Sequence, residues 1–212
     1  MRILKLSNKK KEVTKITKKA LEKGEVIIFP TDTVYGLVCN ATNPEAVKKI
    51  FRIKDRSLDK PIGVFVKDVE MIKMFAEVSK EQENFLRRLE ERISKITMVL
   101  EQREDCGLPK ILFGGKKTIG IRVSDHKLIQ DLFLEINFPL AQTSANISGL
   151  RASTKIQEVL KQFENQVIQP DLVLDGGDLE ESNPSTVIDL TSRNPQVLRE
   201  GEISREVIFK AF

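Results

Sequence analysis

The stretch that carries most information is residues 29–61, which opens with FPTDTVYGL and closes with KDRSLDKP. The segment that leads into it is apolar, as in a buried strand, and the chain then passes through several hydroxyl groups, a carboxylate and a tyrosine. Three cations, Lys54, Arg56 and Lys60, follow within seven residues. Hydroxyl groups and a carboxylate can hold an amino acid, whereas fixed cations can hold phosphates. The stretch therefore predicts a site that activates a small molecule with a nucleotide.

Length and composition predict a single domain over residues 1–212. Hydrophobic residues make up 40% of the chain, which is enough for one well-packed core. Charged residues make up 31% but are of mixed sign, and the formal net charge is only +4. This balance permits contact with a nucleotide or a nucleic acid without requiring it.

The few cysteines and the single histidine exclude several kinds of site. Cys39 and Cys106 lack the spacing of a disulfide framework or a zinc site. His126 is the only imidazole, so a two-histidine metal site is impossible and any catalytic triad would have to use it. We expect His126 to be a surface or capping residue at a helix start, and we expect no metal site built from side chains. The chemistry should then depend on positioning and charge.

The termini and hydropathy predict a cytoplasmic protein without contact with a membrane. The first eleven residues are polar and basic, unlike a secretory signal. The sequence also contains no run of about 18 apolar residues that could span a bilayer.

Strand-like and helix-like segments alternate along the chain, which predicts an α/β fold with helices flanking an open sheet. Late strands follow one another without helices between them, so we expect a mixed sheet. A capping box at Ser79–Gln82 predicts one helix start, with Phe85, Leu86, Leu89 and Ile93 buried. Helices are expected over residues 9–23 and from Asn43, Ser79, Asp125 and Thr154; strands are expected at residues 26–29, 62–66, 96–100, 118–123, 139–142, 172–174, 187–190 and 196–198.

Polar clusters follow several of these strands, where open α/β sheets place their ligands. They are residues 118–122, residues 143–149, and residues 183–189 with 199–201. Each cluster taken alone is also explained by loop residues that bond their own backbone. The chain has neither a P-loop nor a Gly-x-Gly-x-x-Gly motif, so any use of ATP would follow another scheme.

Six blocks in order resemble one family. They are PTDTVYGL (30–37), KxRxxxKP (54–61), GIRV (120–123), TSANISG (143–149), PSTV (184–187) and LREG (198–201). Over about residues 12–204 the chain resembles the YrdC/Sua5 family, the threonylcarbamoyl-AMP synthases. The resemblance implies an open, twisted sheet with a concave basic face. It implies the conversion of L-threonine, bicarbonate and ATP to threonylcarbamoyl-AMP and pyrophosphate, a nucleotidyl transfer that supplies N6-threonylcarbamoyladenosine at position 37 of tRNA.

The resemblance also assigns roles to residues. Thr33 and Arg122 would hold threonine, with Ser185 and the backbone of Gln142 nearby. Lys54 and Arg56 would be catalytic and would also bind the nucleotide, together with Lys60, Thr118, Ser144, Asn146 and Arg199. Mg²⁺ would bridge phosphates rather than bind carboxylates. The expected partners are a separate complex that transfers the product to tRNA and, as a further candidate, tRNA itself.

The chain departs from the family pattern in places. Residues 93–96 read ISKI where many members have Pro-Gly-Pro, and Asp55 replaces a usual glycine beside the phosphate site. Phe65 stands where some archaeal members have histidine, and Ala152 where some have serine. Long members carry a C-terminal domain, so we expect this chain to be the short form.

Two alternatives stay open. Hydrogenase-maturation carbamoyltransferases contain the same fold, although they would need acylphosphatase-like and zinc-finger segments that do not occur here. A non-catalytic module could instead bind tRNA or double-stranded RNA on the basic face.

Overall fold

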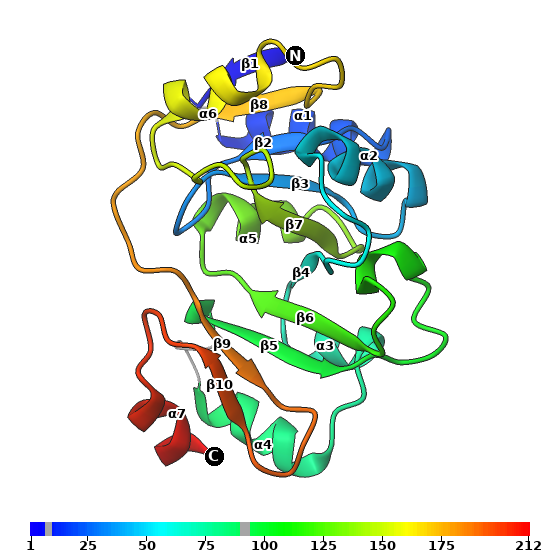
Figure 1. The fold of residues 1–212 in the computed structure, drawn as a ribbon, viewed down its shortest axis with the longest axis vertical. Coiled ribbons are helices and arrows are strands. Elements are labelled where there is room, and N and C mark those ends of the chain that lie inside the picture. Colours follow the sequence, from blue (N-terminus) through cyan, green and yellow to red (C-terminus); the bar gives the residue numbers. More distant parts are fainter. Residues whose placement is uncertain (7–9, 90–93) are drawn as a thin grey trace.

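One mixed sheet extends through the computed structural model, which describes residues 1–6, 10–89 and 94–212 (Figure 1). Parallel and antiparallel pairs alternate irregularly across it, which confirms the expected mixed α/β sheet. From top to bottom in Figure 1, the ten strands of the described ranges are β1 (Arg2–Lys5), β8 (Leu172–Asp175), β2 (Ile27–Phe29), β3 (Gly36–Asn40), β7 (Leu140–Ser144), β4 (Gly63–Val66), β6 (Thr118–Val123), β5 (Ile96–Glu101), β9 (Thr186–Asp189) and β10 (Gln196–Arg199).

Helices flank this sheet, and most begin or end where the sequence predicts. The side chain of Asn43 accepts hydrogen bonds from Glu45 N (3.0 Å) and Ala46 N (3.1 Å), and Ser79 forms the expected reciprocal box with Gln82. The helices are α1 (Lys10–Glu22), α2 (Pro44–Lys54), α3 (Val69–Phe75), α4 (Lys80–Leu89), α5 (Lys127–Phe133), α6 (Ile156–Phe163) and α7 (Arg205–Ala211), with a 3₁₀ helix η2 (Lys110–Phe113).

Five elements of the described ranges were not predicted: β1, β3, α3, α7 and η2. The strand β3 has its first four residues buried, so its sequence lacks the alternation that marks a half-exposed strand. The remaining four are short or lie near a terminus, where local patterns are weak. The predicted residues Lys9 and Ile93 lie outside the described ranges.

The two faces of β6 show how the sheet separates core from site. Ile119 and Ile121 are buried on one face, whereas the alternate residues Thr118, Gly120 and Arg122 face a cavity. In the described part of the chain, no helix has the length and apolar character needed to cross a bilayer.

Candidate functional site

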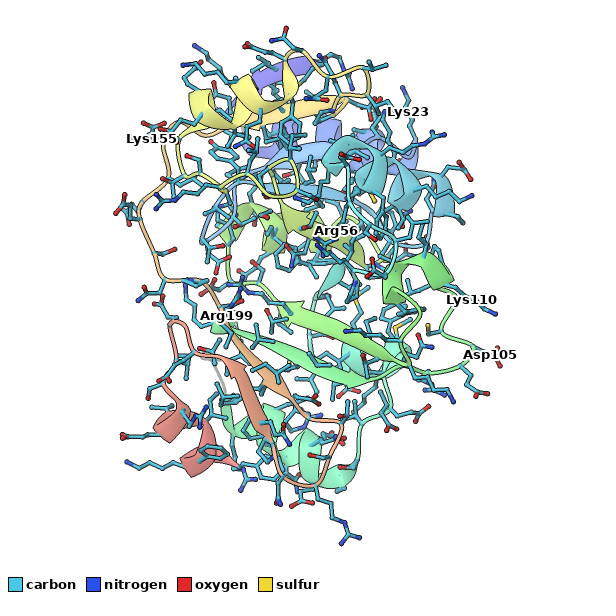
Figure 2. All side chains as sticks on the ribbon, in the orientation of Figure 1. Lys23, Arg56, Asp105, Lys110, Lys155 and Arg199 are labelled. Carbon is cyan, nitrogen blue, oxygen red and sulfur yellow. The ribbon has the colours of Figure 1, made fainter. Side chains whose placement is uncertain are left out.

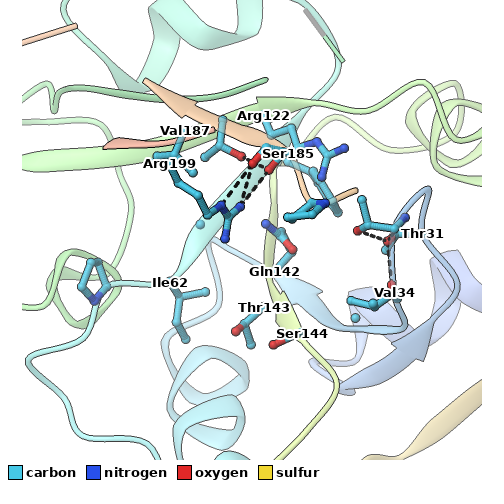
Figure 3. Close-up of a pocket in the computed structure, with 18 of the residues that line it drawn as sticks. Thr31, Val34, Ile62, Arg122, Gln142, Thr143, Ser144, Ser185, Val187 and Arg199 are labelled. Carbon is cyan, nitrogen blue, oxygen red and sulfur yellow. Dashed lines mark hydrogen bonds between the residues drawn. The ribbon is translucent and has the colours of Figure 1, made fainter. Parts of the chain in front are cut away.

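A cavity of about 790 Å³ opens where the predicted clusters meet (Figure 3). Its size falls in the range of small-molecule sites. Residues from β3 to β7, β9 and β10, and from the loops between them, line it. Of the predicted site residues, those on its wall are Thr33, Arg56, Thr118, Arg122, Gln142, Ser144, Ser185 and Arg199.

Among the described residues, four cations line this cavity: Arg56, Lys116, Arg122 and Arg199. Figure 2 shows Arg56 and Arg199 in the middle of the molecule, whereas Lys23, Lys110 and Lys155 lie on its outer surface. Burial of the guanidinium lowers the pKa of Arg56 from its ordinary value, although the group stays protonated at neutral pH. The arrangement can therefore hold a multiply charged anion against the sheet.

Arg122 is a buried cation at one end of the cavity. Its Nε donates to Ser94 O (2.8 Å), and its Nη2 donates to a carboxylate oxygen of Asp32. The side chains of Arg122 and Asp32 are only 6% and 8% exposed. The guanidinium carbon lies 6.0 Å from the ring centroid of Phe65, which also lines the cavity. Burial lowers the pKa of Arg122, and the negative charge of Asp32 opposes that shift. These contacts hold one fixed guanidinium at the cavity wall.

The turn at residues 31–34, here called the hydroxyl turn, lies beside Arg122, which contacts its Asp32. Thr31 Oγ1 donates to Val34 O (2.7 Å) and accepts from Thr33 N (3.2 Å), so the turn is stabilised by its own side chain. Thr33 lies on the cavity wall with its Oγ1 3.2 Å from that of Thr31. Val34 also lines the cavity, whereas Leu37, which the sequence placed beside the same turn, is buried in the core.

Arg199 and Ser185 form another part of the wall, and Ser185 lies between Arg199 and Arg122 in Figure 3. Arg199 Nε and Nη2 both donate to Ser185 O, at 3.2 and 2.8 Å, and Ser185 Oγ lies 2.9 Å from Thr97 Oγ1. Gly201 permits this contact because a Cβ there would lie 2.0 Å from Pro184 O. These contacts fix Arg199, at the end of β10, to the segment that precedes β9.

Lys54 is not on the cavity wall but beneath it. Its ammonium is buried and donates to Ser144 O (2.6 Å), Asn146 O (2.7 Å) and Asn146 Oδ1 (3.1 Å). Burial lowers the pKa of Lys54 to about 7, and the charge of Arg56 acts in the same direction, whereas three acceptors favour the charged form. Asn146 bonds Ile147 O and Leu150 O through Nδ2 and likewise lies off the wall. The geometry makes both residues supports of the end of β7, where Ser144 lies, and of the loop that follows it.

Arg56 and Lys60, predicted as a pair, differ in placement. Arg56 lines the cavity and donates to Lys60 O (3.3 Å) and Pro61 O (2.9 Å), so the guanidinium is braced by its own loop. The Lys60 side chain is exposed and is not part of the lining. Asp55 between Lys54 and Arg56 has φ 48°, the left-handed conformation, which explains why glycine suits this position.

Sequence reasoning missed Lys116, Asp189 and the partners of Arg122. Lys116 lines the cavity but stands in a loop without a motif, whereas Asp189 lines it at the end of the predicted cluster 183–189 without having been assigned a role. His126 occupies the N-cap position of α5, as expected, and its ring packs edge-on against Phe29 at 6.3 Å. It is not part of the cavity lining.

Tyr35 joins the hydroxyl turn to the segment 176–185, which connects the upper and lower parts of the sheet in Figure 1. Its hydroxyl donates to Gly177 O (2.6 Å) and accepts from Gly176 N (3.0 Å). Farther along the same segment, Ser182 Oγ donates to Asp32 O (2.9 Å). The segment is thus attached twice to the turn that carries Thr33.

Tyr35 provides a spectroscopic test of this attachment because it is the only tyrosine in a chain without tryptophan. Burial raises its pKa from 10.0 to about 12, which the hydrogen bond from Gly176 N only partly offsets. The folded state therefore keeps a proton that the unfolded state loses, so this stability is present below pH 10 and is lost as pH rises toward 12. Near-ultraviolet titration should give a midpoint near 12 in native protein and near 10 in urea. A native midpoint equal to the unfolded one would contradict the buried contact.

Comparisons with known proteins all indicate one family. The sequence pattern of the Sua5/YciO/YrdC family, described as "Telomere recombination", matches residues 19–201. Threonylcarbamoyl-AMP synthase of Vibrio cholerae is 33% identical over 183 residues, which cover 86% of this chain and 94% of the relative. Threonylcarbamoyl-AMP synthase of Pyrococcus abyssi is 34% identical over 191 residues, 90% of this chain. The match spans only about half (54%) of that longer relative.

A solved structure agrees with the sequence relatives. The crystal structure of P. abyssi Sua5 complexed with L-threonine superposes with a TM-score of 0.86 at 31% sequence identity. The superposition covers 99% of this chain and 60% of that chain. The fold is therefore shared with part of that protein over nearly the whole of this chain.

Proposed function

The chain belongs to the Sua5/YciO/YrdC family, and on that basis we propose that it is a threonylcarbamoyl-AMP synthase that transfers the AMP group of ATP. The observation that carries the proposal is one cavity with a buried guanidinium and hydroxyls at one end and further cations along its walls. Eight of the residues assigned from the sequence lie on that cavity: Thr33, Arg56, Thr118, Arg122, Gln142, Ser144, Ser185 and Arg199.

Threonine is proposed to bind at the Arg122 end. A guanidinium recognises a carboxylate through charge-assisted hydrogen bonds, and Thr33 lies beside it to bond the amino acid. Gln142 and Ser185 complete this end. The apolar side chain of Val34 offers a surface for the threonine methyl group.

ATP is proposed to bind along Arg56, Thr118, Ser144 and Arg199, with Lys116 as an added cation. Arginine pairs planar forks with phosphate oxygens, and hydroxyl groups add directional bonds. Lys54 and Asn146 would act from beneath the wall by holding Ser144, at the end of β7, in place. Lys60 stays a predicted nucleotide-binding residue. Its exposed side chain would have to move to reach a nucleotide in the cavity.

The proposed reaction requires alignment rather than a protein nucleophile. The threonine amine combines with bicarbonate to give a carbamate and water. A carbamate oxygen then attacks the α-phosphate of ATP, and the bond to pyrophosphate breaks. Fixed cations stabilise the charge that develops on the phosphate oxygens, and the cavity holds the reacting atoms in line.

Mg²⁺ is assigned to the phosphates of ATP. Within residues 1–6, 10–89 and 94–212, no three His, Cys, Asp or Glu side chains converge in a way that could hold a metal ion. A cation that keeps several waters and binds phosphate oxygens suits this donor set. The proposed product would pass to a separate complex that modifies tRNA, and direct binding of tRNA stays a secondary prediction.

The proposal is tested by pyrophosphate release from ATP with threonine, serine or valine, with and without bicarbonate. Valine should be rejected strongly because a polar group of the site loses its partner, and serine should lose about 1–3 kcal/mol because only a methyl contact is missing. Equal rates with valine and threonine, or release that ignores bicarbonate under CO2-free conditions, would contradict the proposal. Binding of RNA without any release would support the non-catalytic alternative.

A further inference from the structure

A second cation lies behind Arg122 and has no role in the reaction described above. The ammonium of Lys95 is 3.7 Å from Asp32 Oδ2, the same oxygen that accepts a hydrogen bond from Arg122 Nη2. Lys95 Nζ is also 3.8 Å from Asp125 Oδ2, and that oxygen accepts from Ser94 Oγ (2.9 Å). Charges of alternating sign therefore run from the cavity wall outward: Arg122, Asp32, Lys95 and Asp125.

The burial of these four groups decides how strongly their charges interact. Arg122 and Asp32 are almost fully buried, and alone they would form a nearly neutral pair with little attraction for another carboxylate. Lys95 is 28% exposed, whereas Asp125 is 45% exposed and better screened by water. Within the described residues, Asp32 Oδ1 is buried without a hydrogen-bond partner, so Arg122 does not saturate this carboxylate. Lys95 can therefore share the charge of Asp32.

We propose that Lys95 is a positioning residue for the amino-acid end of the cavity. By sharing the carboxylate of Asp32, Lys95 leaves Arg122 with enough positive charge to attract the carboxylate of threonine. Lys95 is not part of the cavity lining, so it acts through Asp32 and does not touch the substrate. The inference rests on the proposed function and adds to it a residue that determines affinity for the amino acid but not for ATP.

The first test compares binding of threonine and of ATP to Lys95→Met, Lys95→Arg and wild type by calorimetry. Low salt and about pH 8 suit it, because burial lowers the pKa of nearby His126 and keeps that imidazole neutral. Loss of one partly screened positive charge should raise the threonine Kd about 3- to 10-fold and change the ATP Kd by less than about twofold. Lys95→Arg should restore binding, and the difference from wild type should shrink in high salt.

A matched control is Lys161→Met on α6, which removes an exposed positive charge far along the sheet. It should leave both affinities unchanged. Lys95→Gln is the second neutral variant if methionine lowers the melting temperature. A folded Lys95 variant with an unchanged threonine Kd, or with both affinities lowered equally, overturns the inference.

A double-mutant cycle tests the route through Asp32. In an Asp32→Asn background, Lys95→Met should change the threonine Kd by less than about twofold, because the shared charge is already gone. The full effect of Lys95→Met in that background would overturn the proposed route. A wild type that binds threonine while its Lys95 variants bind equally well contradicts this inference alone, whereas a wild type that binds no threonine contradicts the proposed function and this inference with it.

Discussion

Replacing Arg122 by glutamine should weaken threonine binding by about 10- to 150-fold and destabilise the fold by about 3–5 kcal/mol. The loss of binding has one cause: a charge-assisted hydrogen bond to the substrate carboxylate disappears. The loss of stability has another: Asp32, which is 8% exposed, keeps a buried charge without its main partner. Calorimetric titration with threonine and denaturant unfolding measure the two effects.

The double variant Arg122→Gln with Asp32→Asn separates these effects. Removing both charges should recover most of the lost stability, because no unpaired buried ion remains. It should not recover threonine binding, because the guanidinium is still absent. A double variant that binds threonine as tightly as wild type would show that Arg122 does not hold the substrate.

Replacing Lys54 by methionine should lower the free energy of unfolding by roughly 3 kcal/mol and remove most ATP binding. Methionine fills a similar length but donates no hydrogen bond. Ser144 O, Asn146 O and Asn146 Oδ1 would each lose a buried donor. The end of β7, which places Ser144 on the cavity wall, would then lose its fixed position. Denaturant unfolding and ATP titration provide the measurements.

Lys48→Met is the matched control on the same helix α2. Lys48 is 52% exposed and pairs only with Glu45 three residues earlier, so its loss should cost less than about 1 kcal/mol. Equal losses in the two variants would mean that the burial of Lys54 has no special weight. Wild-type ATP affinity in a folded Lys54→Met variant would contradict its supporting role.

Local sequence patterns predicted most of the secondary structure because caps and alternation act over a few residues. The Ser79–Gln82 box and the alternating strand at residues 118–123 occur where expected. The strand β3 was missed because a short segment whose first four residues are all buried shows no period that distinguishes it from other buried structure. The mixed sheet was predicted in kind, but its strand order depends on pairings between distant segments.

The candidate site follows the same division. The chemical types at the site, hydroxyl groups beside cations, could be read from the sequence. The sequence could not show which of these groups line the cavity wall and which support the wall from beneath. Lys54 lies beneath the cavity because it meets a loop 90 residues away, and Arg122 meets Asp32 across the same separation.

The sequence by itself determined most of the elements, the family motifs and the polar groups placed at strand ends, because each depends on neighbours along the chain. Only the tertiary structure decided which of those groups face the cavity and which carry it from below. Burial, charge sharing and hydrogen-bond partners arise between segments that sheet pairing brings together. The link from Lys95 through Asp32 to Arg122 is such a case, since its three residues come from separate parts of the chain and acquire a shared charge only in the folded protein.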